Sequence, residues 1–246
     1  MNSPPKHNTD KSAESFRELL ARLGLPRGLL KSVLACYKSC YLTVRDSYVI
    51  VRHVDIGGCH GSHEIEKRDR VTRWQEIQEC LSFHSHMAAK CWIRTKLWLV
   101  NEDDENGHKF SLCCGSPDDV PDEVSRLITA LKHATLAQDQ CPLSAQIHKI
   151  TKIISEMAPA LNAHDQKVTV VICTQGLPTN EHGISTRTIQ HEFWNELIEL
   201  SKVPVRTIIR LCTYDKGVSN AYKKMHGRIE SMDVLDDYWG EVCMSG

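Results

Sequence analysis

The sequence predicts an α/β protein with a Rossmann-like, mostly parallel central sheet and helices on both faces. Near-continuous apolar runs, typical of strands buried on both faces, occur at 48–54, 167–173 and 205–212. Between them lie longer segments whose apolar residues recur at helical spacing, and this alternation is typical of a parallel sheet. Hydrophobic residues make up 41% of the chain and charged residues 25%, which excludes a largely disordered protein.

The elements follow from these patterns and from turn signals. Gly24 and Pro26 separate two short helices, Asn106-Gly107 indicates a turn between two strands, and Pro142 stands at a first helical position. The expected strands are 41–44, 48–54, 96–100, 109–113, 167–173, 205–212 and 229–235. The expected helices are 12–23, 26–37, 71–89, 119–137, 142–161, 188–200 and 216–225. Val170 and Ile209 are expected to be deeply buried in adjacent or near-adjacent strands.

The 246 residues divide into a tail and one domain. Residues 1–12 are polar and are expected to form a disordered tail. Residues 13–40 are expected to form helices packed on the domain, and 41–246 to form the α/β domain itself. No repeat and no linker divides that domain.

Charge and composition limit the partners. With 30 basic and 31 acidic side chains the net charge is -1, so no global field favours nucleic acid or an anionic membrane. No apolar run reaches the length of a membrane helix, and Met1–Ser12 does not resemble a signal peptide. We therefore expect a soluble protein of the cytoplasm or the nucleus, with its 11 cysteines reduced and mostly acting as small buried hydrophobes.

Three loops are candidates for a functional site, because ligands of such sheets bind beyond the carboxyl ends of the strands, where the strand order switches. They are residues 55–61, 139–142 and 174–183.

These loops carry motifs of a known family. They hold Asp55-Ile-Gly-Gly-Cys59, Cys141-Pro-Leu143 and Thr174-Gln-Gly-Leu-Pro-Thr179; elsewhere lie Thr72-Arg-Trp-Gln-Glu76, Arg210-Leu-Cys-Thr213 and Val234-Leu-Asp-Asp237. In this order the motifs resemble those of von Willebrand factor A (vWA) domains, over about residues 40–245. The resemblance implies a Rossmann-like fold and a non-catalytic protein-interaction module. Members of the family usually bind a divalent cation through the three loops.

The departures from the family pattern concern the metal. Carried over position by position, the metal set is Asp55, Gly57, Cys59, Cys141 and Gln175, of which Asp55 alone matches the family. Glycine offers no side-chain ligand, two thiols replace hydroxyls, and an amide replaces a carboxylate. Mg²⁺ and Ca²⁺ prefer oxygen ligands, so we expect a degenerate site that needs no cofactor. Binding of a protein partner would then fall directly to side chains of the same loops, namely Asp55, His60, Thr174, Gln175, Thr179 and Glu181.

Other chemistries stay open at this point. Gly57–Gly61 could hold a phosphate of a nucleotide against a helix N-terminus, and Cys59 or Cys173 with a histidine could form a nucleophilic pair. No complete nucleotide-binding or hydrolase motif is present, so we do not expect an enzyme. Cys59 and Cys141, with Asp55 and His60, could instead bind Zn²⁺ or form a reversible disulfide, which would make the protein a zinc or redox sensor.

Two further predictions concern polar residues outside the loops. His84 and His86 are two apart on an expected helix, so they should point to different faces and make a poor chelate. Arg206 and Arg210 fit ion pairs at the rim of a sheet better than an anion site.

Overall fold

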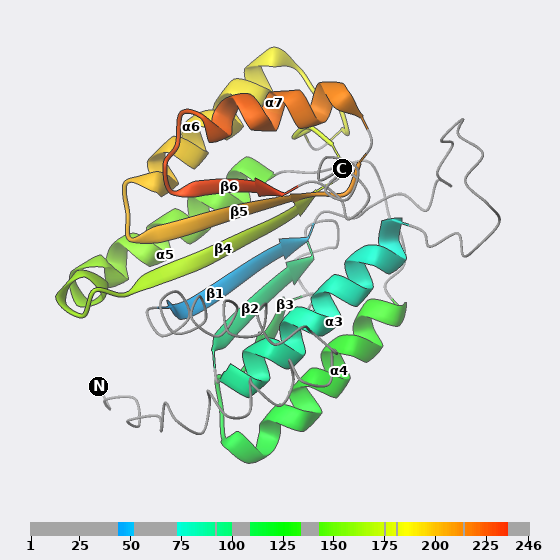
Figure 1. Cartoon of the computed structure of the whole chain (residues 1–246), viewed down its shortest axis with the longest axis vertical. Coiled ribbons are helices and arrows are strands. Elements are labelled where there is room, and N and C mark those ends of the chain that lie inside the picture. The colour runs from blue at the N-terminus through cyan, green and yellow to red at the C-terminus, as the bar shows by residue number, and fades with distance from the viewer. Residues whose placement is uncertain are drawn as a thin grey trace, which may run out of the picture.

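The chain is described by a computed structural model. The structure describes residues 44–51, 73–91, 93–99, 109–133, 143–174, 176–180, 182–213 and 215–235. Within these ranges strands and helices alternate along the chain (Figure 1). The elements are β1 (Val44–Val51), α3 (Arg73–Cys91), β2 (Arg94–Leu99), β3 (Lys109–Leu112), a 3-10 turn (Pro117–Asp119), α4 (Val120–His133), α5 (Leu143–Ala163), β4 (Lys167–Thr174), α6 (Arg187–Ser201), β5 (Val205–Leu211), α7 (Lys216–His226) and β6 (Met232–Leu235).

The strands form a six-stranded sheet in the order β3-β2-β1-β4-β5-β6. All neighbouring strands are parallel except β2 and β3, which pair antiparallel. This order is that of a Rossmann-like sheet, and its switch point lies between β1 and β4. The predicted Rossmann-like, mostly parallel sheet is therefore confirmed.

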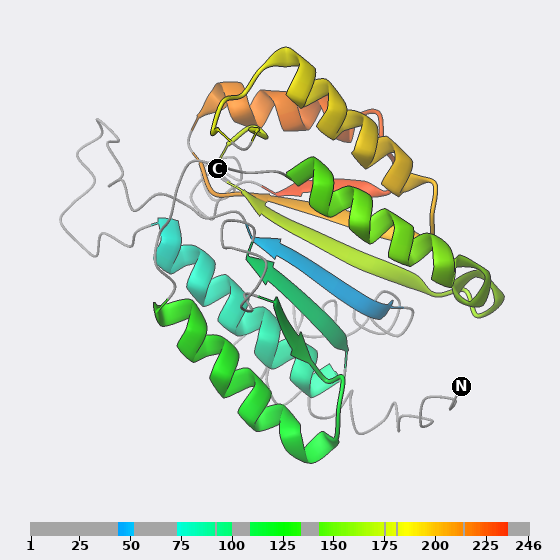
Figure 2. The ribbon, with the colours of Figure 1, turned by 180° about the vertical axis from the view of Figure 1, so that it is seen from behind.

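Helices cover both faces of the sheet (Figures 1 and 2). Successive side chains of a strand point to opposite faces, and β4 shows which helices lie on each. Val168, Val170 and Ile172 belong to a cluster with residues of α5, α6 and α7, whereas Cys173 belongs to a cluster with residues of α3 and α4. We call these clusters the first core and the second core.

The first core contains aliphatic side chains together with Phe193 and Tyr222. Val170 and Ile209 are both fully buried in it, and they lie in the adjacent strands β4 and β5, as predicted. The other members are Leu143, Ile147, Ile150, Ile154, Leu161, Val168, Ile172, Leu197, Leu200, Val205, Leu211, Met225, Ile229 and Met232.

The second core lies on the opposite face and mixes leucines with thiols. Its members are Leu81, Leu97, Leu112, Cys113, Val120, Val124, Leu127, Leu131, Cys173 and Cys212. Cys113, Cys173 and Cys212 are buried, which confirms the packing role expected for Cys173 and Cys212. The side chains of Cys80 and Cys91 lie outside the described residues.

Three strand predictions need correction. A single strand runs over Val44–Val51 where the sequence predicted two, because Asp46 and Ser47 pair in register with both β2 and β4. The strand predicted at 109–113 ends at Leu112, since Cys113 adopts a left-handed conformation with φ 57°. The last strand begins at Met232 rather than 229, because residues 227–231 form a turn after α7.

The helix predictions beyond residue 71 are confirmed to within a few residues, except that the helix expected from 119 to 137 runs over Val120–His133, with Asp119 in the preceding turn. The predictions for the tail, for the helices at 13–40 and for the end of the chain lie outside the described residues. Among the described helices none is long and apolar enough to cross a membrane.

Candidate functional site at the carboxyl edge of the sheet

Two of the three candidate loops follow neighbouring strands at the switch point. β1 and β4 pair in parallel, and Val51 at the end of β1 lies opposite Cys173 near the end of β4. Asp55 comes four residues after Val51, and Gln175 comes directly after Thr174. The ends of β1 and β4, which these two residues follow in the sequence, therefore lie side by side.

The helix that follows the third loop in the sequence, α5, begins at the same edge. Helix α5 leads into β4 through the short connection 164–166, in which Asp165 adopts a left-handed conformation with φ 49°. Figure 2 shows α5 running antiparallel to β4 along its length, so the N-terminus of α5 lies at the carboxyl edge. Cys141 stands two residues before Leu143, the first residue of this helix.

The candidate residues themselves are only partly described. Asp55, Gly57, Cys59, His60, Cys141, Gln175 and Glu181 lie outside the described residues, and Thr174 and Thr179 lie within them. The described residues contain no group of three or more His, Cys, Asp or Glu side chains placed to hold a metal ion. The chemistry of the predicted donor set still decides whether the family's cation fits. One carboxylate, one amide, two thiols and a glycine do not fit Mg²⁺ or Ca²⁺, so no step is assigned to either ion.

Thr174 fixes the start of the loop after β4. Its hydroxyl donates to the carbonyl oxygen of Gly176 at 3.0 Å and accepts from the Gly176 N–H at 3.3 Å. Its carbonyl oxygen accepts from the N–H of Cys212 at 2.9 Å, which extends the pairing of β4 and β5 beyond the last strand residue. Thr174 is fully buried and Thr179 is 7% exposed. Their burial assigns both threonines to the support of the loop, and a direct contact with a partner would require the loop to open.

A second hydrogen-bonded turn follows in the same loop. The side-chain oxygen of Asn180 accepts from the N–H groups of His182 and Ile184, each at 2.9 Å. The N–H of Asn180 donates to the carbonyl oxygen of Ile184 at 3.0 Å, and Gly183 takes φ 74°, a conformation that favours glycine. These bonds hold Ile184 in a position where its side chain is 56% exposed.

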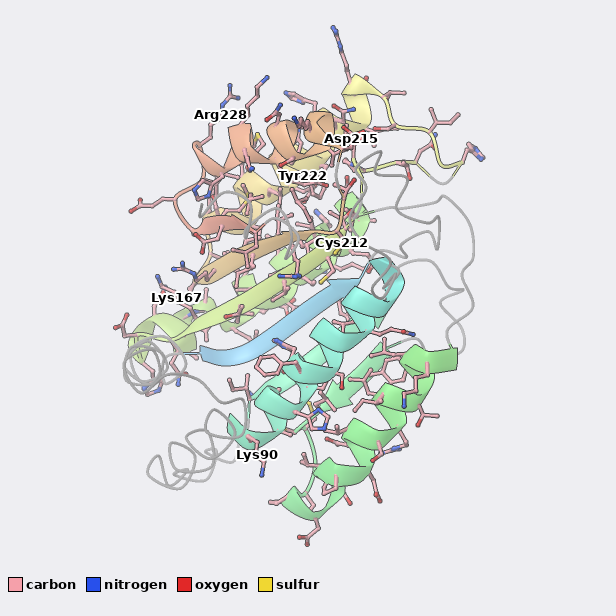
Figure 3. The ribbon with its side chains drawn as sticks, turned by 45° about the vertical axis from the view of Figure 1, so that its right-hand side comes forward. Lys90, Lys167, Cys212, Asp215, Tyr222 and Arg228 are labelled. Carbon is pink, nitrogen blue, oxygen red and sulfur yellow. The ribbon has the colours of Figure 1, made fainter. Side chains whose placement is uncertain are left out.

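An aromatic cluster supports the loop from the first core. Phe193 and Trp194 of α6 lie against Tyr222 of α7, with ring centroids 6.2 and 5.2 Å from that of Tyr222. The Tyr222 hydroxyl donates to the carbonyl oxygen of Gly176 at 3.0 Å. Figure 3 shows Tyr222 between α7 and the sheet, below the edge where Asp215 lies. Tyr222 therefore connects the core to the segment that follows Gln175.

The segment after β5 is also fixed by side chains. The Thr213 hydroxyl accepts from the N–H of Asp215 at 3.2 Å. The carboxylate of Asp215 caps α7 by accepting from the N–H groups of Gly217 at 2.7 Å and Val218 at 3.2 Å. The described part of the carboxyl edge is thus a set of loops with internal hydrogen bonds.

Three residues that shape this edge, Asn180, Asp215 and Tyr222, were not predicted from the sequence. Asn180 and Asp215 had local signals, since asparagine near Gly183 is typical of a turn and aspartate before a helical pattern is typical of an N-cap. Tyr222 had none, because its hydrogen bond joins residues 46 positions apart.

Cys173 does not have the surroundings of a reactive nucleophile. Its side chain is 1% exposed and belongs to the second core. Buried cysteines in apolar surroundings are inert, because catalysis needs an accessible thiolate. The catalytic alternative at Cys173 therefore has no support from the structure, while Cys59 lies outside the described residues.

The two histidines on α3 point to different surroundings, as predicted. Nε2 of His84 is buried and has no hydrogen-bond partner among the described residues, and burial lowers the pKa of His84 to about 4. His86 is exposed, and its Nδ1 lies 2.7 Å from the carbonyl oxygen of Ser82. Arg206 forms an ion pair with Asp233 on the neighbouring strand β6, which confirms the ion-pair interpretation for this arginine.

Comparison with known proteins finds a likeness among solved structures. No family model and no curated protein matches the chain. Among solved structures, the chain is similar to the crystal structure of the TFIIH p34 N-terminal domain, with 7% sequence identity and a TM-score of 0.45 over 78% of this chain and 91% of that one. At this level the likeness carries no information about activity or partners.

Proposed function

We propose that this chain is a non-catalytic protein-interaction module of the vWA type whose family metal site is lost or altered. The observation that carries the proposal is the position of the switch point between β1 and β4. Asp55 and Gln175 follow these two strands, and Cys141 precedes the helix that leads into β4. Ligands of Rossmann-like sheets bind at this place, so the topology supports the carboxyl edge as the contact surface.

The residue types at these positions favour binding without a cation. In the family, the metal completes its ligand shell with an acidic residue of the partner. Here Asp55 is the one position that keeps a family-type ligand, and Gly57, Cys59, Cys141 and Gln175 do not supply the oxygens that a hard cation prefers. Recognition would therefore use protein side chains directly.

The contact surface is assigned to Asp55, His60, Gln175 and Glu181 in the loops, with Thr174 and Thr179 holding the backbone below them. Loops with internal hydrogen bonds lose little conformational entropy on binding, which favours recognition by a preformed surface. We expect the partner to be a protein and the site of action to be the cytoplasm or the nucleus.

The metal part of the proposal is tested by thermal unfolding of the full chain with and without millimolar Mg²⁺. We expect no change in Tm. A ligand at 100 times its Kd stabilises by about 2.7 kcal/mol, or about 5–10 °C for a domain of this size. A rise of that order that disappears in Asp55→Ala would show a working site and contradict the proposal.

Metal content and a thiol count separate the alternatives for the cysteines. For the purified, reduced protein we expect no stoichiometric zinc and 11 free thiols. One zinc ion per chain that Cys59→Ser and Cys141→Ser both remove would support a thiolate zinc site instead. Two parent thiols that disappear on mild oxidation would support a disulfide if the one thiol of the pair that remains in Cys59→Ser or in Cys141→Ser stays reactive.

The protein-binding part is tested with a loop variant that carries Asp55→Ala, His60→Ala, Gln175→Ala and Glu181→Ala. We expect the parent chain to retain a binding protein in the presence of EDTA. The loop variant should no longer retain that protein. The matched control removes the same kinds of side chain at exposed positions away from the edge, Asp122, Glu156, Asn162 and His164, and should retain it. Equal retention by all three proteins would show that the loops are not the contact surface.

A further inference from the structure

Helix α7 concentrates basic residues on its outward side. Residues 216–229 contain Lys216, Lys223, Lys224 and Arg228, together with His226, and no Asp or Glu. Without these four cations the rest of the chain has 26 Lys and Arg against 31 Asp and Glu, a net charge of -5. A chain of net charge -1 thus carries a positive helix on an otherwise acidic protein.

The cations lie on a single face of the helix. Lys216, Asn220, Lys223 and Lys224 are all exposed, and their spacing places them on one side of an α-helix. Tyr222 and Met225 point the other way into the first core. Arg228 is exposed just beyond the C-terminal end of α7, at the opposite end from Asp215 (Figure 3). We call Lys216, Lys223, Lys224 and Arg228 the basic face of α7.

Helix stability explains only part of this arrangement. Lys223, Lys224 and His226 lie in the last turn, where cations interact favourably with the helix dipole. Lys216 lies in the first turn, where the same dipole disfavours a cation. Asp215 and Glu230 are the acidic residues directly before and after residues 216–229 in the sequence. The carboxylate of Asp215 accepts hydrogen bonds from the N–H groups of the helix that it caps.

We propose that the basic face of α7, which begins beside the carboxyl edge at Lys216 and runs along the helix away from it, is a docking surface for an acidic segment of a protein partner. The 11 residues of α7 span about 16 Å, the length of about five residues of extended peptide. Charge complementarity attracts an acidic segment of this length to the basic face of α7. A segment of about five residues is also short enough not to extend onto the acidic remainder of the protein.

The same observations disfavour nucleic acid as the occupant. Single-stranded nucleic acid is held by aromatic side chains on which bases stack, and the outward positions of α7 hold no aromatic residue. A duplex extends well beyond 16 Å and would meet the negative charge of the rest of the chain.

The test is fluorescence anisotropy of the full-length protein with a labelled peptide of alternating Glu and Asp, five residues long. The same peptide with Gln and Asn is the uncharged control. We expect the acidic peptide to bind, the uncharged peptide not to bind, and the affinity to fall several-fold between about 50 and 200 mM salt because exposed charges are screened.

Charge-reversal variants locate the surface. Lys216→Glu, Lys223→Glu and Lys224→Glu together should weaken binding of the acidic peptide at least tenfold. The matched control, Lys90→Glu, Lys132→Glu and Lys152→Glu, makes the same change of net charge at exposed positions on α3, α4 and α5 and should keep most of the affinity. If the three glutamates destabilise α7, the variants Lys216→Gln, Lys223→Gln and Lys224→Gln remove the positive charges without adding negative ones. Circular dichroism checks the fold of each variant.

Three results would overturn the proposal. They are equal loss of binding in both triple variants, equal binding of the uncharged peptide, and tighter binding of a single-stranded oligonucleotide that depends on the same lysines. None of these variants changes Asp55, His60, Gln175 or Glu181. A negative result for the basic face of α7 therefore does not contradict the carboxyl-edge proposal, and a negative result for the loop variant does not contradict the proposal for α7.

Discussion

The first core and the second core cover opposite faces of one sheet but differ in their side-chain chemistry. The first core holds branched aliphatic and aromatic residues, and the hydroxyl of Tyr222, deep within it, is hydrogen-bonded to Gly176. The second core holds three thiols, and α3, which packs on this face, buries Nε2 of His84 without a partner among the described residues. The first core supports the carboxyl edge through Tyr222, whereas the second-core face buries a histidine nitrogen, which lowers the pKa of His84.

The largest expected effect is a charge placed in the first core. Ile209→Asp puts an unpaired carboxylate at a fully buried position, and we expect a loss of more than about 4 kcal/mol or no folding at all. The matched change Ile184→Asp, at a side chain that is 56% exposed, should cost less than about 0.5 kcal/mol. Denaturant unfolding measures both, and equal values would show that the strand assignment of β5 is wrong.

The next effect concerns His84 and the second-core face. Burial lowers the pKa of His84 to about 4 in the folded chain, against about 6.5 when it is unfolded. Above pH 6.5 both states are neutral and His84 contributes no pH dependence. As the pH falls from 6.5 towards 4 the unfolded state binds a proton that the folded state does not, so stability falls, by roughly 2–3 kcal/mol at pH 4.

The measurement is the free energy of unfolding of the parent and of His84→Leu between pH 7 and 4. Carboxylates titrate in both proteins, so the difference between the two curves isolates the histidine. The parent should lose more stability than the variant, and His86→Leu, at an exposed position of the same helix, should follow the parent. Parallel curves for the parent and His84→Leu would mean that His84 is not held neutral by the fold.

These two cores also show how far the sequence determines the fold. The near-continuous apolar run 167–173 predicted β4 almost to the residue, because a strand covered on both faces has few polar side chains to interrupt its pattern. β1 was predicted as two strands because Asp46 and Ser47 interrupt its apolar residues, and its pairing with β2 and β4 overrides that local signal.

The candidate site was less predictable for a physical reason. Local spacing and the family resemblance located the loops, and the strand order confirms that Asp55 and Gln175 follow neighbouring strands. The support of the edge depends on contacts between residues that are distant in sequence, such as Tyr222 with Gly176. Periodicity and turn signals contain no information about such pairs, and burial of Thr174 and Thr179 follows from the same packing.

A smaller effect tests the link between the first core and the carboxyl edge. Tyr222→Phe keeps the ring packing against Phe193 and Trp194 but removes the hydrogen bond to Gly176. Because the Gly176 carbonyl still accepts from Thr174, we expect a global loss of only about 1 kcal/mol. Hydrogen exchange should become faster at the amides of 176–180 and stay unchanged in β4. Unchanged exchange in the loop would show that Tyr222 is a core residue without a role at the edge.

The most direct measurement rebuilds the family's metal site at the carboxyl edge. In one chain, Gly57→Ser, Cys59→Ser, Cys141→Thr and Gln175→Asp restore oxygen ligands around Asp55. We expect millimolar Mg²⁺ to raise the Tm of this fourfold variant by several degrees, to leave the Tm of the parent unchanged, and to have no effect once Asp55→Ala is added to the variant. A Mg²⁺-dependent rise in the parent, or none in the fourfold variant, would contradict the proposal that these five positions correspond to a vWA-type metal site whose ligands have been replaced.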